Sequence, residues 1–182
     1  LAPMIGTAFH LYLETVIGLK DYLKETKVTV GTIDGYGDIS GTCDGFDITT
    51  GHVVDYKVLS KKKIKAFSSA TFFNEQQEPE FYSDSLTEGQ LKKYHYQMML
   101  YGLGLENAGY EVNHVSLILF PRDCTVESVM VASHELCFKY NRKAALAVLE
   151  RANQIFKWAT ENRDNLGELD SHPGCYYCTF KR

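Results

Sequence analysis

The sequence predicts an α/β domain built around a mixed central β-sheet that is flanked by helices. Segments with the apolar spacing of amphipathic helices alternate along the chain with segments in which apolar and polar residues alternate. The 182 residues contain no internal repeat and no linker, and a chain of this length can bury a sizeable core. We therefore expect one domain over residues 1–164, followed by an irregular tail over residues 165–182.

Helical spacing of apolar residues occurs over residues 5–24, 87–108 and 133–162. Thr87 and Gln90 have the spacing of a capping box, which predicts the start of the second helix. Gly109 follows the point where this helix should end, a common place for glycine. Ser133 is expected to cap the third helix.

Strands are expected over residues 28–31, 36–48, 52–59, 112–120 and 125–132. Residues 49–51 include a glycine and predict a hairpin turn between the second and third strands. In the second strand, Asp38, Ser40, Thr42 and Asp44 share one face because side chains alternate along a strand. A polar face on an otherwise buried strand indicates a lined cleft.

The amino-acid composition and the net charge limit the classes of protein to which this chain can belong. Hydrophobic residues make up 45% of the chain and charged residues 23%, as in ordinary soluble globular proteins. No apolar run approaches the roughly 18 residues needed to cross a bilayer, so we expect no membrane association. The five cysteines are an odd number, which favours a reduced, intracellular protein. The net charge of −4 does not by itself favour nucleic-acid binding, although local charge can override the total.

Asp44, Asp55 and Lys57 form the most informative pattern in the chain. Asp55 and Lys57 are two residues apart on a predicted strand, so they point the same way while Tyr56 points the opposite way. A hairpin would bring Asp44 beside this pair. Two carboxylates with an adjacent lysine suit a divalent metal and a phosphodiester. The pattern leaves open whether Lys57 acts as a base or as an electrostatic clamp.

A basic run follows this strand directly. It consists of Lys61, Lys62, Lys63 and Lys65, which are candidates to bind DNA phosphates or are merely a solvated strand end. Residues 68–89 show no sustained period and predict a long loop, either a lid or a disordered insertion. Its aromatic residues could stack on unpaired bases or anchor the loop: Phe72, Phe73, Phe81 and Tyr82.

The order of these motifs resembles the PD-(D/E)XK nuclease superfamily. More narrowly, it looks like the RecB-like branch, which includes the CRISPR-associated exonucleases and related phage recombination exonucleases. The matching segments are residues 6–14, 41–44, 53–57 and 95–102, and residues 175–178 add a further similarity. The resemblance implies a restriction-endonuclease-like core and a nuclease domain over residues 1–164.

The resemblance also implies a metal site. Asp44 and Asp55 would bind Mg²⁺ or Mn²⁺, with His10 as a third ligand and the carbonyl of Tyr56 as a fourth. Oxygen ligands suit both ions, and a histidine shifts the preference toward Mn²⁺. Glu14 is a candidate helper, either for a second metal or for orienting His10.

Further catalytic residues follow from the resemblance. Lys57 would hold or deprotonate the attacking water, and Gln97 and Tyr101 would brace the site and contact the DNA strand near the scissile phosphate. Gln90 and Tyr94 repeat the same spacing seven residues earlier and form a rival pair. The later pair is preferred because it sits closer to the family pattern.

Cys175 and Cys178 allow three interpretations. Related exonucleases hold a 4Fe-4S cluster with one cysteine before the first helix and three near the C-terminus, which here requires a native chain that extends beyond both ends. Otherwise the two cysteines and His172 would make a partial zinc site, or the cysteines are ordinary thiols.

The resemblance leads us to expect a metal-dependent DNA exonuclease of phage or bacterial recombination or repair, whose partners are DNA and a single-strand annealing or recombination protein. It would act in the bacterial cytoplasm, or in the host cytoplasm if it is phage-encoded. An endonuclease or spacer-processing enzyme of the same fold would use the same residues. A non-catalytic DNA-binding subunit is a further alternative, but a degenerate member should lose Lys57 or a carboxylate, and this chain retains them. A redox protein built on the Cys-x-x-Cys lacks the strand-to-helix context that such a site needs.

Overall fold

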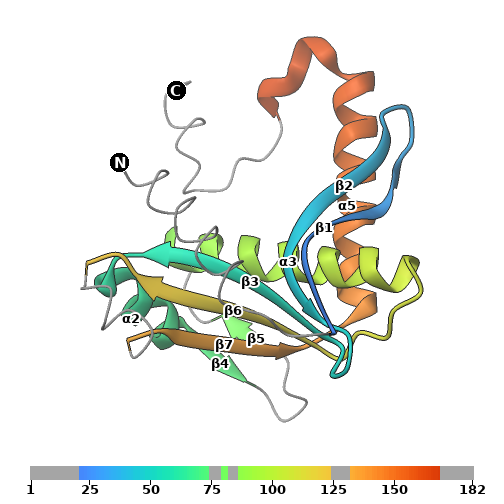
Figure 1. The fold of residues 1–182 in the computed structure, drawn as a ribbon. Helices are drawn as coiled ribbons and strands as arrows, with labels where there is room; N and C mark the ends of the chain where they lie inside the picture. Colours follow the sequence, from blue (N-terminus) through green and yellow to red (C-terminus); the bar gives the residue numbers. More distant parts are fainter. Residues whose placement is uncertain (1–20, 74–78, 82–85, 124–131, 169–182) are drawn as a thin grey trace.

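A five-stranded sheet with the order β1-β2-β3-β6-β7 forms the centre of the domain (Figure 1). The computed structural model describes residues 21–73, 79–81, 86–123 and 132–168. The strands of the sheet are β1 Tyr22–Ile33, β2 Gly37–Asp47, β3 His52–Leu59, β6 His114–Pro121 and β7 His134–Lys139. Neighbouring strands are antiparallel except β3 and β6, which are parallel. The sheet is therefore mixed, and the predicted fold class is confirmed.

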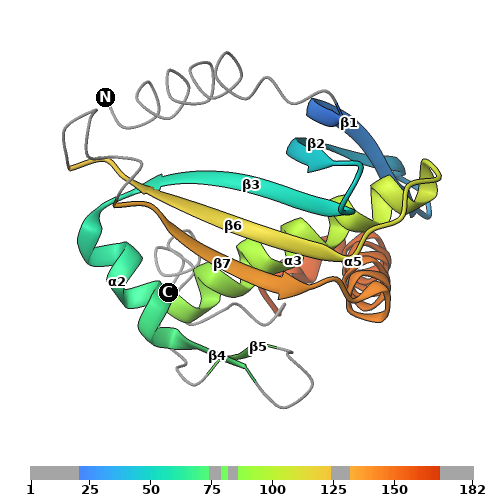
Figure 2. The ribbon, with the colours of Figure 1, turned by 60° about the horizontal axis from the view of Figure 1, so that its bottom comes forward.

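The described helices pack against this sheet. They are α2 Lys61–Ala70, α3 Leu86–Asn107 and α5 Arg142–Glu161, and a short 3₁₀ helix, Arg163–Glu168, follows α5. Figure 2 shows α2 and α3 on the same side of β3, β6 and β7, while α5 contacts α3 and β1. A small hairpin of β4 Thr71–Phe73 and β5 Pro79–Phe81 lies outside the main sheet.

The main core lies between the sheet and α3. Val53 of β3, Leu117 of β6 and Phe138 of β7 are buried in one cluster with Met98 and Leu103 of α3. These strand residues alternate with residues on the opposite face, so every second side chain of β3 points toward α3. This geometry determines which residues of β3 can meet the helix.

The hairpin between β2 and β3 was correctly predicted, and its turn requires glycine. Gly51 has φ of 67°, and its amide donates to the carbonyl of Asp47 at 2.9 Å. A β-carbon on Gly51 would lie 2.6 Å from the carbonyl oxygen of Glu111, so a larger residue would clash as well as be strained. The turn holds β2 and β3 in register.

The predicted third helix was wrong at its start. Residues 134–139 form strand β7, in which Leu136 and Phe138 are buried while Glu135 and Cys137 are exposed. This alternation has the period of a strand, but it is short and merges with the helical pattern that follows. The helix begins at Arg142, and the side chain of Asn141 caps it by accepting from the amide of Ala144 at 3.1 Å.

Other boundaries also differ from the predictions. β1 is longer than the expected strand and includes residues 22–24, which had been predicted as helix. The basic run lies in α2 instead of at a strand end. Residues 68–89 are not one loop, because they contain the end of α2, both small strands and the start of α3 at Leu86. Thr87 therefore lies inside α3, one residue after its start, and not before the helix as predicted.

Some predictions lie outside the described residues, namely the helix over residues 5–20, most of the strand over residues 125–132, and the tail beyond residue 168. Among the helices that the structure describes, none has both the length and the apolar character needed to span a membrane.

Candidate active site

Asp55 and Lys57 of β3 form a buried ion pair. The Nζ atom of Lys57 lies 2.5 Å from Oδ2 of Asp55, and the Asp55 side chain is only 1% exposed. Both residues belong to the set of β3 side chains that point toward α3, whereas Tyr56 packs on the other face with Phe120. The alternation of β3 thus delivers a carboxylate and an ammonium group to the same place.

Asp44 reaches the same place from β2. Gly45 and Phe46 pair with Val54 and Val53, and continuing this register by one residue puts Asp44 opposite Asp55. The Oδ2 atom of Asp44 accepts a hydrogen bond from the amide of Tyr56 at 2.8 Å. The hairpin therefore brings both carboxylates and Lys57 together, as the sequence pattern predicts.

The pKa of Lys57 depends on its burial and on the two neighbouring carboxylates. Burial favours the neutral amine and lowers the pKa, but the attraction of Asp55, a hydrogen bond to it and the attraction of Asp44 outweigh this effect. The pKa of Lys57 is therefore raised above its ordinary value. Without a bound metal, Lys57 is therefore protonated at neutral pH.

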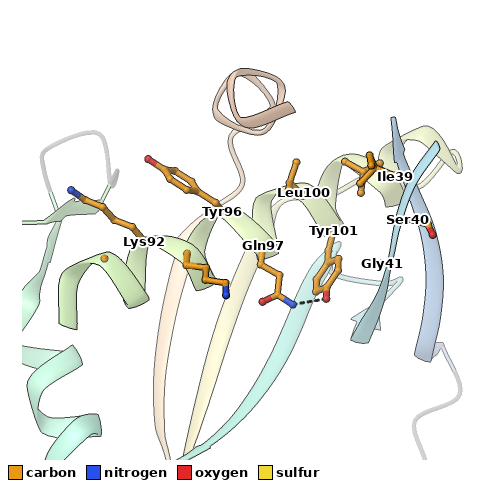
Figure 3. A pocket seen from close by; sticks show the side chains of 11 residues that line it. Ile39, Ser40, Gly41, Lys92, Tyr96, Gln97, Leu100 and Tyr101 are labelled. Atoms are coloured by element: carbon orange, nitrogen blue, oxygen red, sulfur yellow. Dashed lines mark hydrogen bonds between the residues drawn. The ribbon is translucent and has the colours of Figure 1, made fainter. Parts of the chain in front are cut away.

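Gln97 and Tyr101 of α3 face this cluster from the helix. Figure 3 shows their side chains side by side, and Nε2 of Gln97 donates to the hydroxyl of Tyr101 at 2.6 Å. Burial raises the pKa of Tyr101, the bond from Gln97 lowers it, and the charges of Asp55, Lys57 and Asp44 act on it as well. Tyr101 is thus within electrostatic range of all three charged groups.

A glycine on β2 makes room for this tyrosine. A β-carbon on Gly41 would lie 2.8 Å from Cε1 of Tyr101, so the ring packs directly on the backbone of the strand. Gly41 belongs to the same sequence motif as Asp44. The motif thus provides both a carboxylate and the space that lets α3 approach.

The rival pair on α3 also reaches the site, which the sequence analysis missed. Nε2 of Gln90 donates to the hydroxyl of Tyr94 at 2.7 Å, and the ring centroid of Tyr94 is 5.4 Å from Nζ of Lys57. A cation over an aromatic ring at this distance is attracted to it. The available signal was the seven-residue spacing of Tyr94 and Tyr101, which puts both on one face of a helix.

Tyr56 is anchored on the other face of β3. Its hydroxyl is hydrogen-bonded to the hydroxyl of Tyr22 at 3.0 Å, and burial of Tyr22 together with this bond raises the pKa of Tyr22. This anchor holds the segment whose backbone carbonyl was predicted as a metal ligand. The remaining predicted ligand His10 and its helper Glu14 lie outside the described residues, as do Cys175 and Cys178.

The predicted phosphate-binding lysines lie on α2. Lys61, Lys62 and Lys65 are exposed, whereas Nζ of Lys63 lies 5.8 Å from the ring centroid of Phe67. A helix spreads these residues around its axis, so they do not form one continuous row. At most a part of the run can face a single bound strand.

An open groove adjoins the candidate site. It has a volume of about 760 Å³ and runs between the β1–β2 hairpin and α3 (Figure 3). Its lining includes Ser40 and Gly41 on one side and Lys92, Lys93, Gln97 and Tyr101 on the other. One wall of the groove thus ends in the residues that face the charge cluster.

The donors of the cluster fit a hard divalent cation. Asp44 and Asp55 supply carboxylate oxygens from adjacent strands, and the Tyr56 carbonyl is the backbone oxygen between Asp55 and Lys57. Oxygen donors of this kind are the usual ligands of Mg²⁺ and Mn²⁺. A carboxylate buried as deeply as Asp55 also needs a nearby cation, which Lys57 provides here.

Comparisons with known proteins bear on the fold only. No protein-family model matches the chain, and no curated protein matches it. Among solved structures, the chain is similar to the one titled "Crystal structure of SSO0001", with a TM-score of 0.51 and 15% sequence identity. The match covers 86% of this chain and 61% of that chain. Likeness at this identity supports a shared α/β architecture.

Proposed function

We propose that this chain is a metal-dependent DNA exonuclease of the RecB-like branch of the PD-(D/E)XK superfamily. It would hydrolyse phosphodiester bonds in phage or bacterial recombination or repair. The observation that carries this proposal is the ion pair of Asp55 and Lys57, 2.5 Å apart, with Asp44 on the adjacent strand. These are the groups that the resemblance requires to converge.

The protein side of the chemistry follows from the charges. Hydrolysis of a phosphodiester puts additional negative charge on the phosphoryl oxygens in the transition state, so the site must provide fixed positive charge there. Lys57 meets this need because Asp55 and Asp44 keep it protonated. The hydroxyl of Tyr101 and the amide of Gln97 are polar groups that can orient a phosphate beside it.

Asp44, Asp55 and the Tyr56 carbonyl would hold Mg²⁺ or Mn²⁺. When bound, such an ion lowers the pKa of water and stabilises negative charge on phosphate oxygens. Burial of Asp55 keeps its carboxylate in one orientation, and the amide of Tyr56 does the same for Asp44 at 2.8 Å. The two acids are thus oriented by the protein itself.

The groove beside α3 supports a polymeric substrate. Lys92 and Lys93 lie on the same wall as Gln97 and Tyr101, so a polyanionic strand in the groove would meet positive charge before it meets the site. The groove wall is therefore locally positive although the net charge of the chain is −4. A strand lying there would present its phosphates to the cluster in succession.

The test is degradation of labelled DNA with Mg²⁺ or Mn²⁺ by purified protein. Asp44→Asn, Asp55→Asn and Lys57→Gln should each abolish activity without unfolding the chain, and EDTA should abolish the activity of the unmodified protein. Asp38→Asn is the matched control, because Asp38 lies on β2 but is exposed and accepts from the hydroxyl of Thr32 at 2.9 Å. Full activity of Asp55→Asn or Lys57→Gln protein, free of contaminating nucleases, would overturn the proposal.

A second comparison tests the exonuclease assignment. End-labelled linear DNA should be degraded, whereas covalently closed circular DNA should remain intact. Cutting of both substrates would mean that Asp44, Asp55 and Lys57 form the active site of an endonuclease. Binding of DNA without cutting of either would favour the non-catalytic subunit.

A further inference from the structure

A second polar cluster lies on the sheet face opposite Asp55 and Lys57. His52 begins β3, Ser116 lies on β6, and Glu135 and Cys137 lie on β7. The register pairs Ser116 directly with Cys137, and Ile118 with Glu135. Three neighbouring strands thus contribute to one cluster through side chains of the same face.

The cluster is held by hydrogen bonds. Nε2 of His52 is 2.7 Å from the hydroxyl of Ser116, and that hydroxyl donates to Oε1 of Glu135 at 2.6 Å. Ser116 is fully buried, whereas Glu135 and Cys137 are exposed. Ser116 lies buried at the centre of the cluster, where its hydroxyl orients the side chains of His52 and Glu135.

We propose that His52, Glu135 and Cys137 bind a zinc ion. The ring nitrogen of His52, a carboxylate oxygen of Glu135 and the sulfur of Cys137 all lie within 4.8 Å of one another. Imidazole nitrogen, carboxylate oxygen and thiolate sulfur are the three donor types that zinc accepts, and three protein ligands leave one coordination position open. The nitrogen and sulfur donors favour zinc over Mg²⁺ and Mn²⁺.

The spacing needs only a small adjustment. Nε2 of His52 and Oε1 of Glu135 are 4.0 Å apart. With zinc–ligand bonds of about 2.0–2.3 Å, ligand atoms in a tetrahedral site are roughly 3.3–3.8 Å apart. The exposed side chains of Glu135 and Cys137 can close this difference by rotation about their own bonds. The backbones of β3, β6 and β7 can therefore stay in place.

Zinc binding would change the protonation of His52 and Cys137. Because the single hydroxyl hydrogen of Ser116 goes to Glu135, Nε2 of His52 donates to Ser116, and zinc binding through Nε2 requires the ring proton to be on Nδ1 instead. Zinc binding would release the thiol proton of Cys137 to solvent, because the thiolate is the ligand.

Ser116 is a positioning residue in this site. When Nε2 of His52 turns from the hydroxyl to zinc, Ser116 still donates to Glu135 and holds that carboxylate in place. Outer partners of this kind typically contribute about 10- to 100-fold in metal affinity. The site would tie β3, β6 and β7 together by one ion.

The inference does not depend on the proposed nuclease activity. His52 and Asp55 are three residues apart on β3, which is roughly 10 Å along a strand, and they point to opposite faces. The two sites also have different donors, so the cluster at His52 would prefer zinc and the cluster at Asp55 would prefer Mg²⁺. A nuclease test and a zinc test can therefore fail independently.

The experiment is a zinc titration of the 182-residue chain with a competing chromophoric chelator, in excess Mg²⁺. It uses a Cys175→Ser/Cys178→Ser background so that the tail contributes no thiolate. We expect one equivalent of zinc, loss of affinity by more than about 100-fold in His52→Ala and Cys137→Ser, and by about 10- to 100-fold in Ser116→Ala. His114→Ala is the matched control and should bind normally, because the His114 ring is 6.1 Å from that of His52 but outside the cluster.

Replacement of zinc by Co²⁺ provides a second readout. The charge-transfer absorption of a cobalt–thiolate bond should appear in the background protein and disappear in Cys137→Ser, whose exposed site should tolerate serine. A titration with no bound zinc would overturn the proposal. So would equal affinity of Cys137→Ser and His114→Ala proteins, or cobalt spectra that lack the thiolate band.

Discussion

Lys57 and Asp55 are two residues apart on β3, and their charged groups meet 2.5 Å from each other beneath α3. The carboxylate is 1% exposed and the lysine side chain 22% exposed. Each charge has been taken out of water to a different extent, so each is stabilised by the other. This dependence has measurable consequences for stability and for activity.

Removing Lys57 should cost more stability than removing an exposed cation. Lys57→Ala leaves a buried carboxylate without its ammonium partner, and we expect the free energy of unfolding to fall by about 3 kcal/mol in metal-free buffer. Asp55→Asn/Lys57→Met removes both charges and should recover most of this loss. Urea denaturation at neutral pH measures both changes.

The exposed pair of Arg142 and Glu106 is the control for this comparison. Their side chains are 53% and 25% exposed, and the charged atoms are 2.6 Å apart. Arg142→Ala should lower stability by about 1 kcal/mol or less, because solvent screens such pairs. If Lys57→Ala costs no more than Arg142→Ala, the buried pair is not a coupled unit.

The positive charge of Lys57 should matter more than its ability to lose a proton. Its pKa is raised by Asp55 and Asp44 in spite of burial, so the cation persists as pH increases through the ordinary lysine range. We therefore expect Lys57→Arg to retain measurable nuclease activity and Lys57→Met to retain none. Initial rates at saturating metal test this, and equal loss in both variants would favour a role as base.

Gln97 should contribute more to the reaction than Gln90. Both donate to a tyrosine one turn later, at 2.6 Å and 2.7 Å, but only Gln97 and Tyr101 line the groove. Gln97→Ala should lower kcat by about 10- to 100-fold, in the range typical of the outer partners of a metal site. Gln90→Ala should have a smaller effect, exerted through Tyr94 and Lys57. Steady-state kinetics of the two variants will rank them.

His95 should make the domain less stable in acid. It is 5% exposed and packs against the Phe138 ring at 4.9 Å, and burial lowers its pKa from 6.5 to about 4. Between these values the unfolded chain binds a proton that the folded chain does not, so stability falls as pH decreases below 6.5. The loss should reach roughly 3 kcal/mol at pH 4.

His95→Leu should flatten this part of the pH dependence. The comparison needs urea denaturation of both proteins from about pH 7.5 to about pH 4, with His114→Gln as the control for an exposed histidine. The slope of stability against pH is the readout, because the substitution also alters the baseline. An unchanged slope in His95→Leu would mean that another group titrates.

Local patterns were reliable where a strand has one clear period and a well-defined turn. β2 and β3 were predicted within a residue of their observed bounds, since the alternation is long and Gly51 marks the turn. The common direction of Asp55 and Lys57 followed from the same alternation. β7 was missed because six residues of alternation precede a strong helical pattern that includes their apolar positions.

The sequence by itself determined the mixed α/β class, the hairpin and the meeting of Asp44, Asp55 and Lys57, because strand alternation and turn register are local properties. Only the tertiary structure decided that Tyr94 as well as Tyr101 reaches Lys57, since this depends on how α3 crosses the sheet. It also brought His52, Glu135 and Cys137 together across three strands. Pairing between distant strands is set by packing of the whole sheet, and no local period encodes it.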